Sequence, residues 1–341
     1  MTEDVAPRTR VVTITDVARH AGVSASTVSY VLSGKRSISA GTRARVQASV
    51  RALGFHPHAG ARALASNRSN VIALALPLRR GMHLPVVMQF AAAVLAAARA
   101  ADNDVLLVTA DEGAAGLRRI AGSALVDGLI LMDIETSDER VPTLSELDRP
   151  SVLIGLPAEP AGLICVDLDF ERAGALCVEH LAALGHRRIV LLGAPQVVYD
   201  RGTGFAQRTR DAVQVAAQRN GVRAYAVPVE PVYPAALAAV EGIGDATALI
   251  VHNEGVVDHV LTALRALGRR VPQDISVLAI CPDEVALGAT PPLSNVRIPA
   301  EEVARLAVEL LLARGAGHDV PARTLLPPTL TDRTSTAAYA G

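Results

Sequence analysis

The residues of this chain best suited to bind another molecule are the basic side chains near its N-terminus. Residues 1–68 contain ten Lys and Arg but only three acidic residues, which gives this segment a net charge of +7, while the rest of the 341-residue chain carries −8. A small basic module on an acidic body attracts phosphate groups at one end of a molecule. These charges lie within a periodic helical pattern, so a solvated basic tail does not explain them.

No group of residues has the spacing of a catalytic or metal-binding site. Cys165, Cys177 and Cys281 are odd in number and lack metal-ligand spacing, which predicts reduced core thiols in a cytoplasmic protein. Gly-Thr-Gly at 202–204 lacks the preceding strand and turn of a dinucleotide site. The first ten residues have no apolar signal region, and no uncharged run of 18 apolar residues follows. We therefore expect neither an enzyme nor a membrane protein, and no cofactor.

Two short helices and a third one position the basic side chains. Thr13 and Asp16 have the spacing of a capping box, Gly22 provides a sharp turn, and Ser24 is placed to cap the next helix. Two short helices joined by a glycine-containing turn are typical of a helix-turn-helix. The expected helices cover residues 14–21 and 25–32, and a third helix starts at Ser39. On the second helix Val28, Val31 and Leu32 should face inward, and on the third helix Val46, Val50 and Leu53.

From residue 71 onward, apolar strands alternate with longer helical stretches. Continuous apolar strands between helices indicate buried parallel sheets, and nine strands are too many for one comfortable sheet unit. The sequence therefore predicts two doubly wound lobes. The expected strands are 71–77, 104–110, 128–133, 151–155, 163–167, 188–194, 224–229, 248–253 and 275–280, and the helical stretches are 85–101, 169–184, 205–219, 255–267 and 300–314.

Ordered motifs along the chain resemble the lac repressor (LacI) family of bacterial regulators. The headpiece reads T-x-x-D-V-A-x-x-A-G-V-S-x-x-T-V-S, then G-F-H-P and A-R-x-L. The body adds V-D-L-D-x-x-x-A-G at 166–174, R-x-x-G-F at 201–205 and V-P-Q-D-I-S-V at 271–277. The resemblance implies a transcriptional regulator, most often a repressor, that binds double-stranded operator DNA as a homodimer. It also implies a body similar to periplasmic sugar-binding proteins, with a small-molecule effector in the cleft.

The resemblance assigns DNA-binding roles to nine residues. Ser24 serves equally well as a plain helix cap, and a helix N-terminus is itself a phosphate site, so we expect both roles. Leu64 is either a minor-groove wedge or an ordinary core leucine, and Gly60 weakens the hinge helix by about 1 kcal/mol relative to alanine. The implied base-reading residues are Ala25, Ser26 and Tyr30, the phosphate contacts are Ser24, Thr27 and Thr42, and the hinge residues in the minor groove are Ala61, Arg62 and Leu64.

The implied effector site departs from the family pattern. Relatives carry glycine, an aromatic residue and aspartate where this chain has Ala279-Ile280-Cys281, and Asp283 lies two residues later. Aromatic residues are scarce, with no Trp, and Arg79, Arg80 and Arg201 raise the alternative of an anionic ligand in place of a sugar. Arg201 can instead form a surface salt bridge, and His252 can line the cleft. The implied effector-binding residues are Pro77, His83, Arg201, Asn253, Cys281 and Asp283.

We expect a headpiece over residues 1–55, a hinge over 56–69 and an effector domain over 70–341. Lobe 1 is expected at about 70–162 and 293–322, and lobe 2 at about 163–292 and 323–341, so that the late strand 295–299 returns to lobe 1 and 324–330 to lobe 2. The short C-terminus has no tetramerising heptads, which favours a dimer. An exported solute-binding protein is the alternative from another class, and whether the ligand releases or promotes DNA binding stays open.

Overall fold

The computed structural model describes residues 12–33, 36–55, 68–111, 113–123 and 125–339 and divides the chain into two units, 1–69 and 70–341. The expected hinge residues Ala61, Arg62 and Leu64 lie outside the described residues. No helix among the described residues is long and apolar enough to cross a membrane.

The first unit is a three-helix headpiece. Helix α1 (Ile14–Ala21) starts with the expected capping box: the Thr13 hydroxyl accepts from Asp16 N at 3.3 Å, and Thr13 N donates to the Asp16 carboxylate at 3.0 Å. Gly22 ends it with φ of 64°, a left-handed conformation that glycine adopts without strain. Helices α2 (Ala25–Ser33) and α3 (Ala40–Leu53) follow, the latter capped by Ser39.

The headpiece core contains the apolar residues expected for all three helices, with one exception. Val17, Val28 and Val46 are fully buried, and Phe55 closes the core after α3. Leu32, which was expected to face inward, is 38% exposed because α2 is near its end there and Val31 takes the inward position. The helix-turn-helix is therefore confirmed with this single correction.

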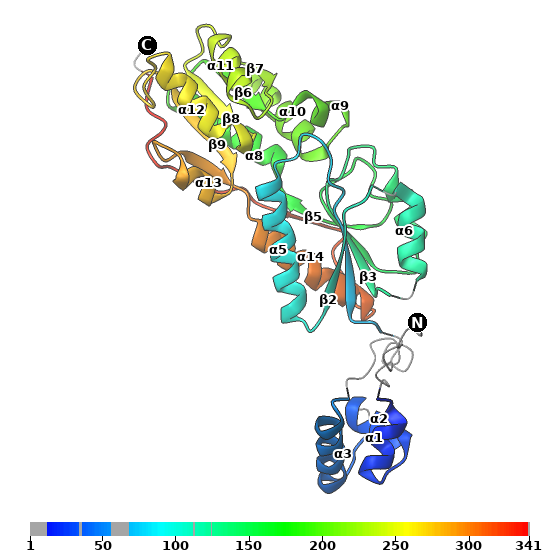
Figure 1. Cartoon of the computed structure of the whole chain (residues 1–341). Coiled ribbons are helices and arrows are strands. Elements are labelled where there is room, and N and C mark those ends of the chain that lie inside the picture. The colour runs from blue at the N-terminus through cyan, green and yellow to red at the C-terminus, as the bar shows by residue number, and fades with distance from the viewer. Residues whose placement is uncertain (1–11, 34–35, 56–67, 112, 124, 340–341) are drawn as a thin grey trace, which may run out of the picture. The chain divides into compact units, whose positions relative to one another are not determined.

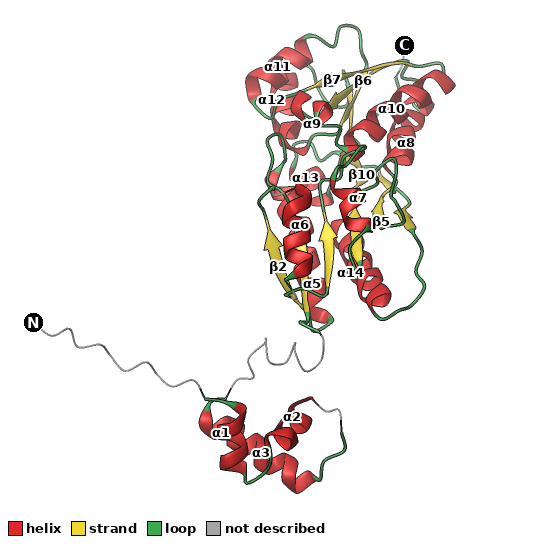
Figure 2. Ribbon diagram, turned by 90° about the vertical axis from the view of Figure 1, so that its right-hand side faces the viewer, coloured by secondary structure: helices red, strands yellow, loops and turns green. Residues whose placement is uncertain are grey.

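The second unit contains two six-stranded sheets, each forming one lobe (Figures 1 and 2). The first sheet is parallel throughout, and the second is parallel except for its edge strand β12. The first sheet has the order β11 (Arg323–Leu326), β5 (Ile164–Leu168), β4 (Ser151–Ile154), β3 (Gly128–Leu131), β1 (Val71–Ala75) and β2 (Asp104–Val108). The second has the order β12 (Leu330–Thr331), β10 (Ser294–Arg297), β9 (Ser276–Cys281), β8 (Ala248–Val251), β6 (Arg188–Gly193) and β7 (Arg223–Pro228).

Helices cover both faces of each sheet, and the apolar strands are buried between them (Figure 1). In lobe 1, α5 (Leu84–Ala100) and α14 (Ala300–Gly315) cover one face, and α6 (Gly113–Gly122) and α7 (Arg140–Ser145) the other. In lobe 2, α8 (Phe170–Ala183) and α10 (Gly204–Arg219) cover one face, and α11 (Tyr233–Glu241), α12 (Val257–Ala266) and α13 (Asp283–Gly288) the other. Short helices α9 (Gln196–Asp200) and η1 (Glu254–Val256) precede α10 and α12.

All nine expected strands are present, but the expected lobe boundaries are wrong for three strands. β5 belongs to lobe 1, since it pairs with β4. The late strand β10 pairs with β9 in lobe 2, and β11 pairs with β5 in lobe 1, the reverse of the expected returns. The residue pattern of a strand predicts that it is buried, but the sheet that it joins depends on which sheet edge it pairs with. The chain thus crosses between the lobes after β5, after β10 and after β11.

Candidate DNA-binding and effector sites

The exposed face of α2 presents the three residues expected to read bases. Ala25 and Ser26 lie exposed in the first turn, and Tyr30 follows one turn after Ser26 with 38% of its surface exposed. Val28, which points the opposite way, is fully buried in the headpiece core. This burial fixes the rotation of α2, because only one side of a short helix can pack while the other stays free to enter a groove.

Hydroxyl groups converge at the N-terminus of α2. Ser24 Oγ accepts from Thr27 N at 3.2 Å and lies 2.8 Å from Thr27 Oγ1 and 2.9 Å from Ser26 Oγ. Ser24 therefore caps the helix, as the sequence predicted, and remains exposed to solvent. At α3, Ser39 Oγ donates to the Thr42 hydroxyl at 2.9 Å, and Thr42 is partly buried. Both helix starts can thus offer hydroxyl and backbone N–H groups to phosphate oxygens.

Basic side chains surround this face, and one of them was missed by the sequence reasoning. The Arg36 guanidinium lies 5.8 Å from the centre of the Tyr30 ring, within reach of a cation–π contact. The contact joins Tyr30, which is expected to read bases, to Arg36, whose positive charge can attract phosphate. The two residues lie in different segments, since Arg36 follows the end of α2. The exposed arginines of the described headpiece are Arg19, Arg36, Arg43, Arg45 and Arg51.

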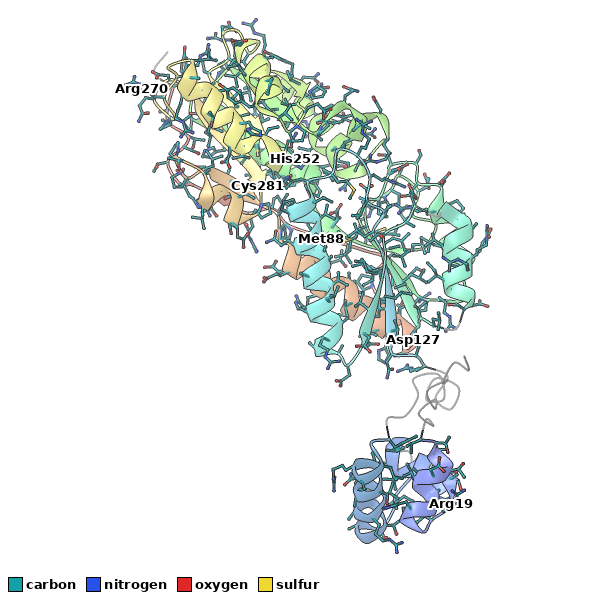
Figure 3. The ribbon with its side chains drawn as sticks, viewed as in Figure 1. Arg19, Met88, Asp127, His252, Arg270 and Cys281 are labelled. Atoms are coloured by element: carbon teal, nitrogen blue, oxygen red, sulfur yellow. The ribbon has the colours of Figure 1, made fainter. Side chains whose placement is uncertain are left out.

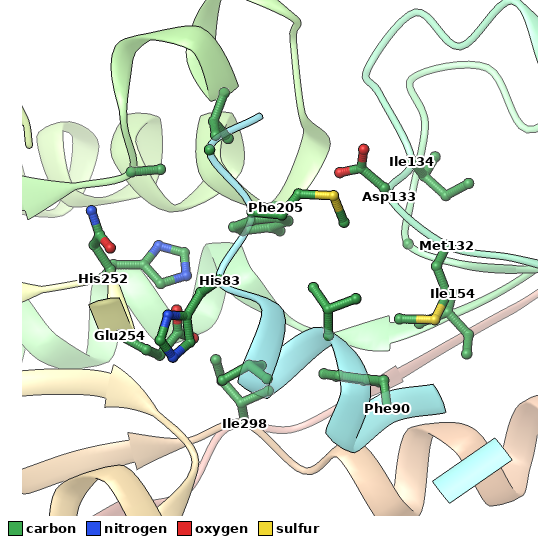
Figure 4. Close-up of a pocket in the computed structure, with 18 of the residues that line it drawn as sticks. His83, Phe90, Met132, Asp133, Ile134, Ile154, Phe205, His252, Glu254 and Ile298 are labelled. Atoms are coloured by element: carbon green, nitrogen blue, oxygen red, sulfur yellow. The ribbon is translucent and has the colours of Figure 1, made fainter. Parts of the chain in front are cut away.

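The second candidate site is a cavity of about 150 Å³ between the two lobes (Figure 4). Most of the side chains that line it are apolar and come from both lobes. The polar residues are few: His83, Asp133, Asp167, Arg201, His252, Asn253 and Glu254. The apolar side chains include Met82, Val86, Val87, Phe90, Met132, Ile134, Ile154, Phe170, Val198, Phe205 and Ile298.

Backbone contacts join the lobes along one side of this cavity. Thr136 N donates to Gly202 O at 2.7 Å, and Gly204 N donates to Ile134 O at 2.9 Å. A Cβ atom on Gly204 would lie 3.0 Å from the carbonyl oxygen of Leu156. Glycine is required there because the backbones of the two lobes approach too closely for a side chain.

Three of the expected effector residues line the cavity: His83, Arg201 and Asn253. The Asn253 amide does not point a free donor at a ligand, since its Nδ2 donates to Gly193 O at 3.1 Å and Val229 O at 2.8 Å. It joins the ends of β6 and β7 behind the cavity wall.

Pro77, Cys281 and Asp283 do not line the cavity. Pro77 faces a separate hollow of about 20 Å³ beside α6 in lobe 1. Cys281 is fully buried in the core of lobe 2. Asp283 is bound at 2.8 Å by Arg333, so it does not replace the aspartate that relatives carry. The family resemblance implied these three residues, which follow or end β1 and β9, but none of them lines the cavity.

Two of the three arginines expected near the cavity, Arg79 and Arg201, pair with carboxylates. Arg79 lies 2.8 Å from Asp111, 2.6 Å from Glu135 and 3.3 Å from Asp133. Arg201 from lobe 2 lies 3.6 Å from Asp133 and donates to the carbonyl of Arg80 at 3.2 Å. These pairs leave little positive charge for a ligand, which weighs against the anionic alternative.

His252 and Glu254 form a second polar cluster at the lobe 2 end of the cavity. His252 is 3% exposed, stacks with Phe170 at 5.5 Å and meets Phe205 edge-on at 5.5 Å. Burial lowers the pKa of His252 to about 4, so the ring is neutral at pH 7, and its Nδ1 atom has no hydrogen-bond partner among the described residues. Burial also raises the pKa of Glu254 to about 7. Sequence reasoning left His252 open and did not single out Phe90 or Asp133 as cavity residues.

Comparisons with known proteins agree with both units. The family model described as "Bacterial regulatory proteins, lacI family" matches residues 13–58, and the one described as "Periplasmic binding protein-like domain" matches 178–336. The chain is 30% identical over 348 residues to the HTH-type transcriptional regulator GalS of Salmonella typhimurium, covering 96% of this chain and 97% of that protein. It is 29% identical over 342 residues to the HTH-type transcriptional regulator CelR of Thermobifida fusca, covering 96% and 99%.

Solved structures show the same architecture. The lac repressor dimer bound to operator and the anti-inducer ONPF is 26% identical, with a TM-score of 0.82 over 96% of this chain and all of that one. The CelR–cellobiose complex is also 26% identical, with a TM-score of 0.67 over 95% and 99%. The chain has a helix-turn-helix headpiece and a two-lobed periplasmic-binding-protein-like body, and its relatives are transcriptional regulators. These findings indicate the same family. The chain belongs to the lacI family of bacterial regulatory proteins, which are DNA-binding regulators of transcription.

Proposed function

We propose that this protein is a transcriptional repressor that binds a near-palindromic operator as a dimer and responds to a small molecule held between its lobes. The observation that carries the proposal is the free outer face of α2. Ala25, Ser26 and Tyr30 are exposed there, while the opposite side of the helix is buried. The capped N-terminus at Ser24 and the surrounding arginines supply phosphate contacts next to the base-reading side chains.

The proposal includes a hinge that completes the contact with DNA. Ala61, Arg62 and Leu64 follow the headpiece and would form a short helix in the central minor groove, with Leu64 wedged into a base step. Support comes from the A-R-x-L motif and from the length of the segment, which is too short to form a stable helix alone. Folding on DNA would therefore couple operator binding to the arrangement of the two bodies.

An apolar surface on lobe 1 supports pairing with a second copy. Leu84, Met88 and Leu95 form an outward stripe on α5 and are each about half exposed, and Figure 3 shows Met88 on this helix. Leu106 and Leu107 of the adjoining edge strand β2 are also exposed. A lone surface helix presents polar residues outward, so the apolar stripe on α5 favours an interface. The lac repressor structure that this chain resembles is a dimer on its operator.

The cavity supports control by a small molecule. It lies where both lobes contribute side chains, so a ligand there can favour one relative position of the lobes. The related CelR structure contains cellobiose, and the resemblance implied a sugar for this chain. An exported solute-binding protein, the other class considered, does not account for the headpiece.

Selection of binding sites from a random double-stranded DNA library tests this function. The full chain should enrich a near-palindromic sequence, and Tyr30→Ala should lose that sequence or change it at matched positions in both half-sites. Tyr225→Ala is the control, because Tyr225 is similarly exposed but lies on β7 in the body. Failure of the wild-type chain to enrich any sequence would refute the proposal, as would identical selection by Tyr30→Ala.

A further inference from the structure

The polar groups of the cavity are concentrated at its two ends. His83, His252 and Glu254 lie at the lobe 2 end, and Asp133 lies at the other, with apolar side chains between them (Figure 4). Among the described residues, no side chain donates a hydrogen bond to Glu254 or forms an ion pair with it. Glu254 is partly buried and its carboxyl group has a hydrogen bond from its own backbone but no charged partner in the described part of the chain, so its position in a ligand cavity points to a ligand that supplies one.

The positive groups near the cavity have carboxylate partners, while the buried Nε atoms of Arg201 and Arg208 have no hydrogen-bond partner among the described residues. Arg201 is bound to Asp133 and to a backbone carbonyl, and Arg208, behind the wall, is bound to Asp167. The neutral His252 ring adds no charge and keeps its Nδ1 atom unpartnered. With the proton on Nε2, this atom is a hydrogen-bond acceptor, so the lobe 2 end presents acceptors and an acid without a cation.

The middle of the cavity suits an apolar group. Phe90, Phe205 and Ile298 lie between the polar ends, together with aliphatic side chains from both lobes (Figure 4). A sugar carries hydroxyl groups around its ring, and each of these loses hydration that this wall cannot replace. The Asn253 Nδ2 group, which could have donated to a hydroxyl group, donates to two backbone carbonyls instead.

We propose that the effector is a small amine with an apolar body, whose ammonium group binds Glu254 and His252 and whose body lies against Phe90 and Phe205. The proposal rests on the proposed function, since it names the ligand class for the same regulatory cavity. An ammonium group offers three donors and a positive charge, which match the Glu254 carboxylate and the His252 acceptor. An apolar body, whether aromatic or aliphatic, needs no hydrogen bonds from the apolar wall, and it excludes water from the ion pair.

Calorimetric titration of the full chain with four probes tests this ligand class. The probes are 2-phenylethylamine, 2-phenylethanol, 3-phenylpropionate and cellobiose, which differ in charge or in apolar character. The amine should bind most tightly, and Glu254→Gln should weaken it by about tenfold or more while changing the affinity for the alcohol by less than about threefold. Glu171→Gln, which changes an exposed acid on α8, is the matched control and should bind all probes as the wild type does.

Several outcomes would overturn this ligand class. They are tighter binding of the carboxylate or of cellobiose, equal loss of amine and alcohol affinity in Glu254→Gln, and no binding by any of the four probes. The same protein preparation is tested on the DNA selected above, which separates the two proposals. Sequence-specific DNA binding without amine binding rejects only the ligand class, whereas amine binding without sequence-specific DNA binding rejects the proposed function.

Discussion

Arg201 of lobe 2 lies 3.6 Å from Asp133 of lobe 1, and the side chains of both residues are largely buried. Asp133 follows β3 at the carboxyl end of the first sheet, where it also receives Arg79 at 3.3 Å. Arg201 follows α9 and donates a second contact to the carbonyl of Arg80. The arginine therefore links the lobes directly across the cleft, and its buried Nε atom has no hydrogen-bond partner among the described residues.

Replacement of Arg201 by alanine should weaken the contact between the two lobes and leave the headpiece intact. Asp133 keeps Arg79 as a partner, so we expect a loss of about 2 kcal/mol in the free energy of unfolding of the body. Operator binding should persist, and its change on ligand addition should be lost. Arg305→Ala is the control, because Arg305 forms an exposed helix pair with Glu309 that contributes little. A full ligand response in Arg201→Ala would remove the residue from the coupling between lobes.

Two substitutions at Ser24 separate its cap role from its proposed phosphate contact. Ser24→Ala should lose the cap to Thr27 N and lower the stability of the headpiece by about 1 kcal/mol. Ser24→Asp retains a capping oxygen, so the headpiece should melt as the wild type does, but the added negative charge should repel DNA phosphate. Thermal melting and operator titration measure the two effects. Wild-type operator affinity in Ser24→Asp would place the N-terminus of α2 away from the DNA backbone.

Local patterns were enough to predict the headpiece and the strands, but not the arrangement that forms the cavity. Val46, Val50 and Leu53 recur at helical spacing, and most of the strands are largely apolar, so both signals are present in short windows. Which sheet receives β10 or β11 depends on partners far away in the chain. The same holds for Asp283, whose partner Arg333 follows fifty residues later. Phe90 and Glu254 line the same cavity only because the two lobes face each other there, and no spacing in the sequence predicts that arrangement.

Leu64→Ala tests the proposed hinge, which lies outside the described residues. The substitution removes the side chain that would enter the minor groove, so specific operator affinity should fall by at least about tenfold. The body should retain its melting temperature, because Leu64 lies outside it. Leu53→Ala is the contrasting change, since Leu53 packs against the headpiece core and its truncation should lower headpiece stability as well. Unchanged operator affinity in Leu64→Ala would exclude the wedge.

The pKa of Glu254 predicts a distinct pH dependence of stability. Folding raises this pKa from 4.5 to about 7 by burial, so the folded state holds a proton that the unfolded state releases. The contribution of Glu254 to the free energy of unfolding is therefore most favourable below pH 4.5, and this advantage is lost as the pH rises through about 7. Glu254→Gln should be more stable than the wild type at pH 8, by up to about 3 kcal/mol, and similar to it at pH 4. His252 has a lowered pKa and the opposite slope, but it is present in both proteins and cancels in their difference. Denaturant unfolding at the two pH values measures this difference, and parallel curves for both proteins would contradict the assignment.

Met88 tests the proposed pairing surface. It lies in the outward stripe of α5 and is 47% exposed, so a lysine there is easily accommodated in a single subunit. In a dimer that buries this stripe, Met88→Lys places a charge in an apolar interface, and the symmetric copy places a second lysine in the same interface. Sedimentation should then show monomers at concentrations where the wild type is dimeric, and operator affinity should fall because two half-sites are no longer bound together. Val215→Lys is the matched control, since Val215 is 45% exposed on α10, and it should leave the dimer intact. If Met88→Lys remains dimeric, the two copies pair through another face.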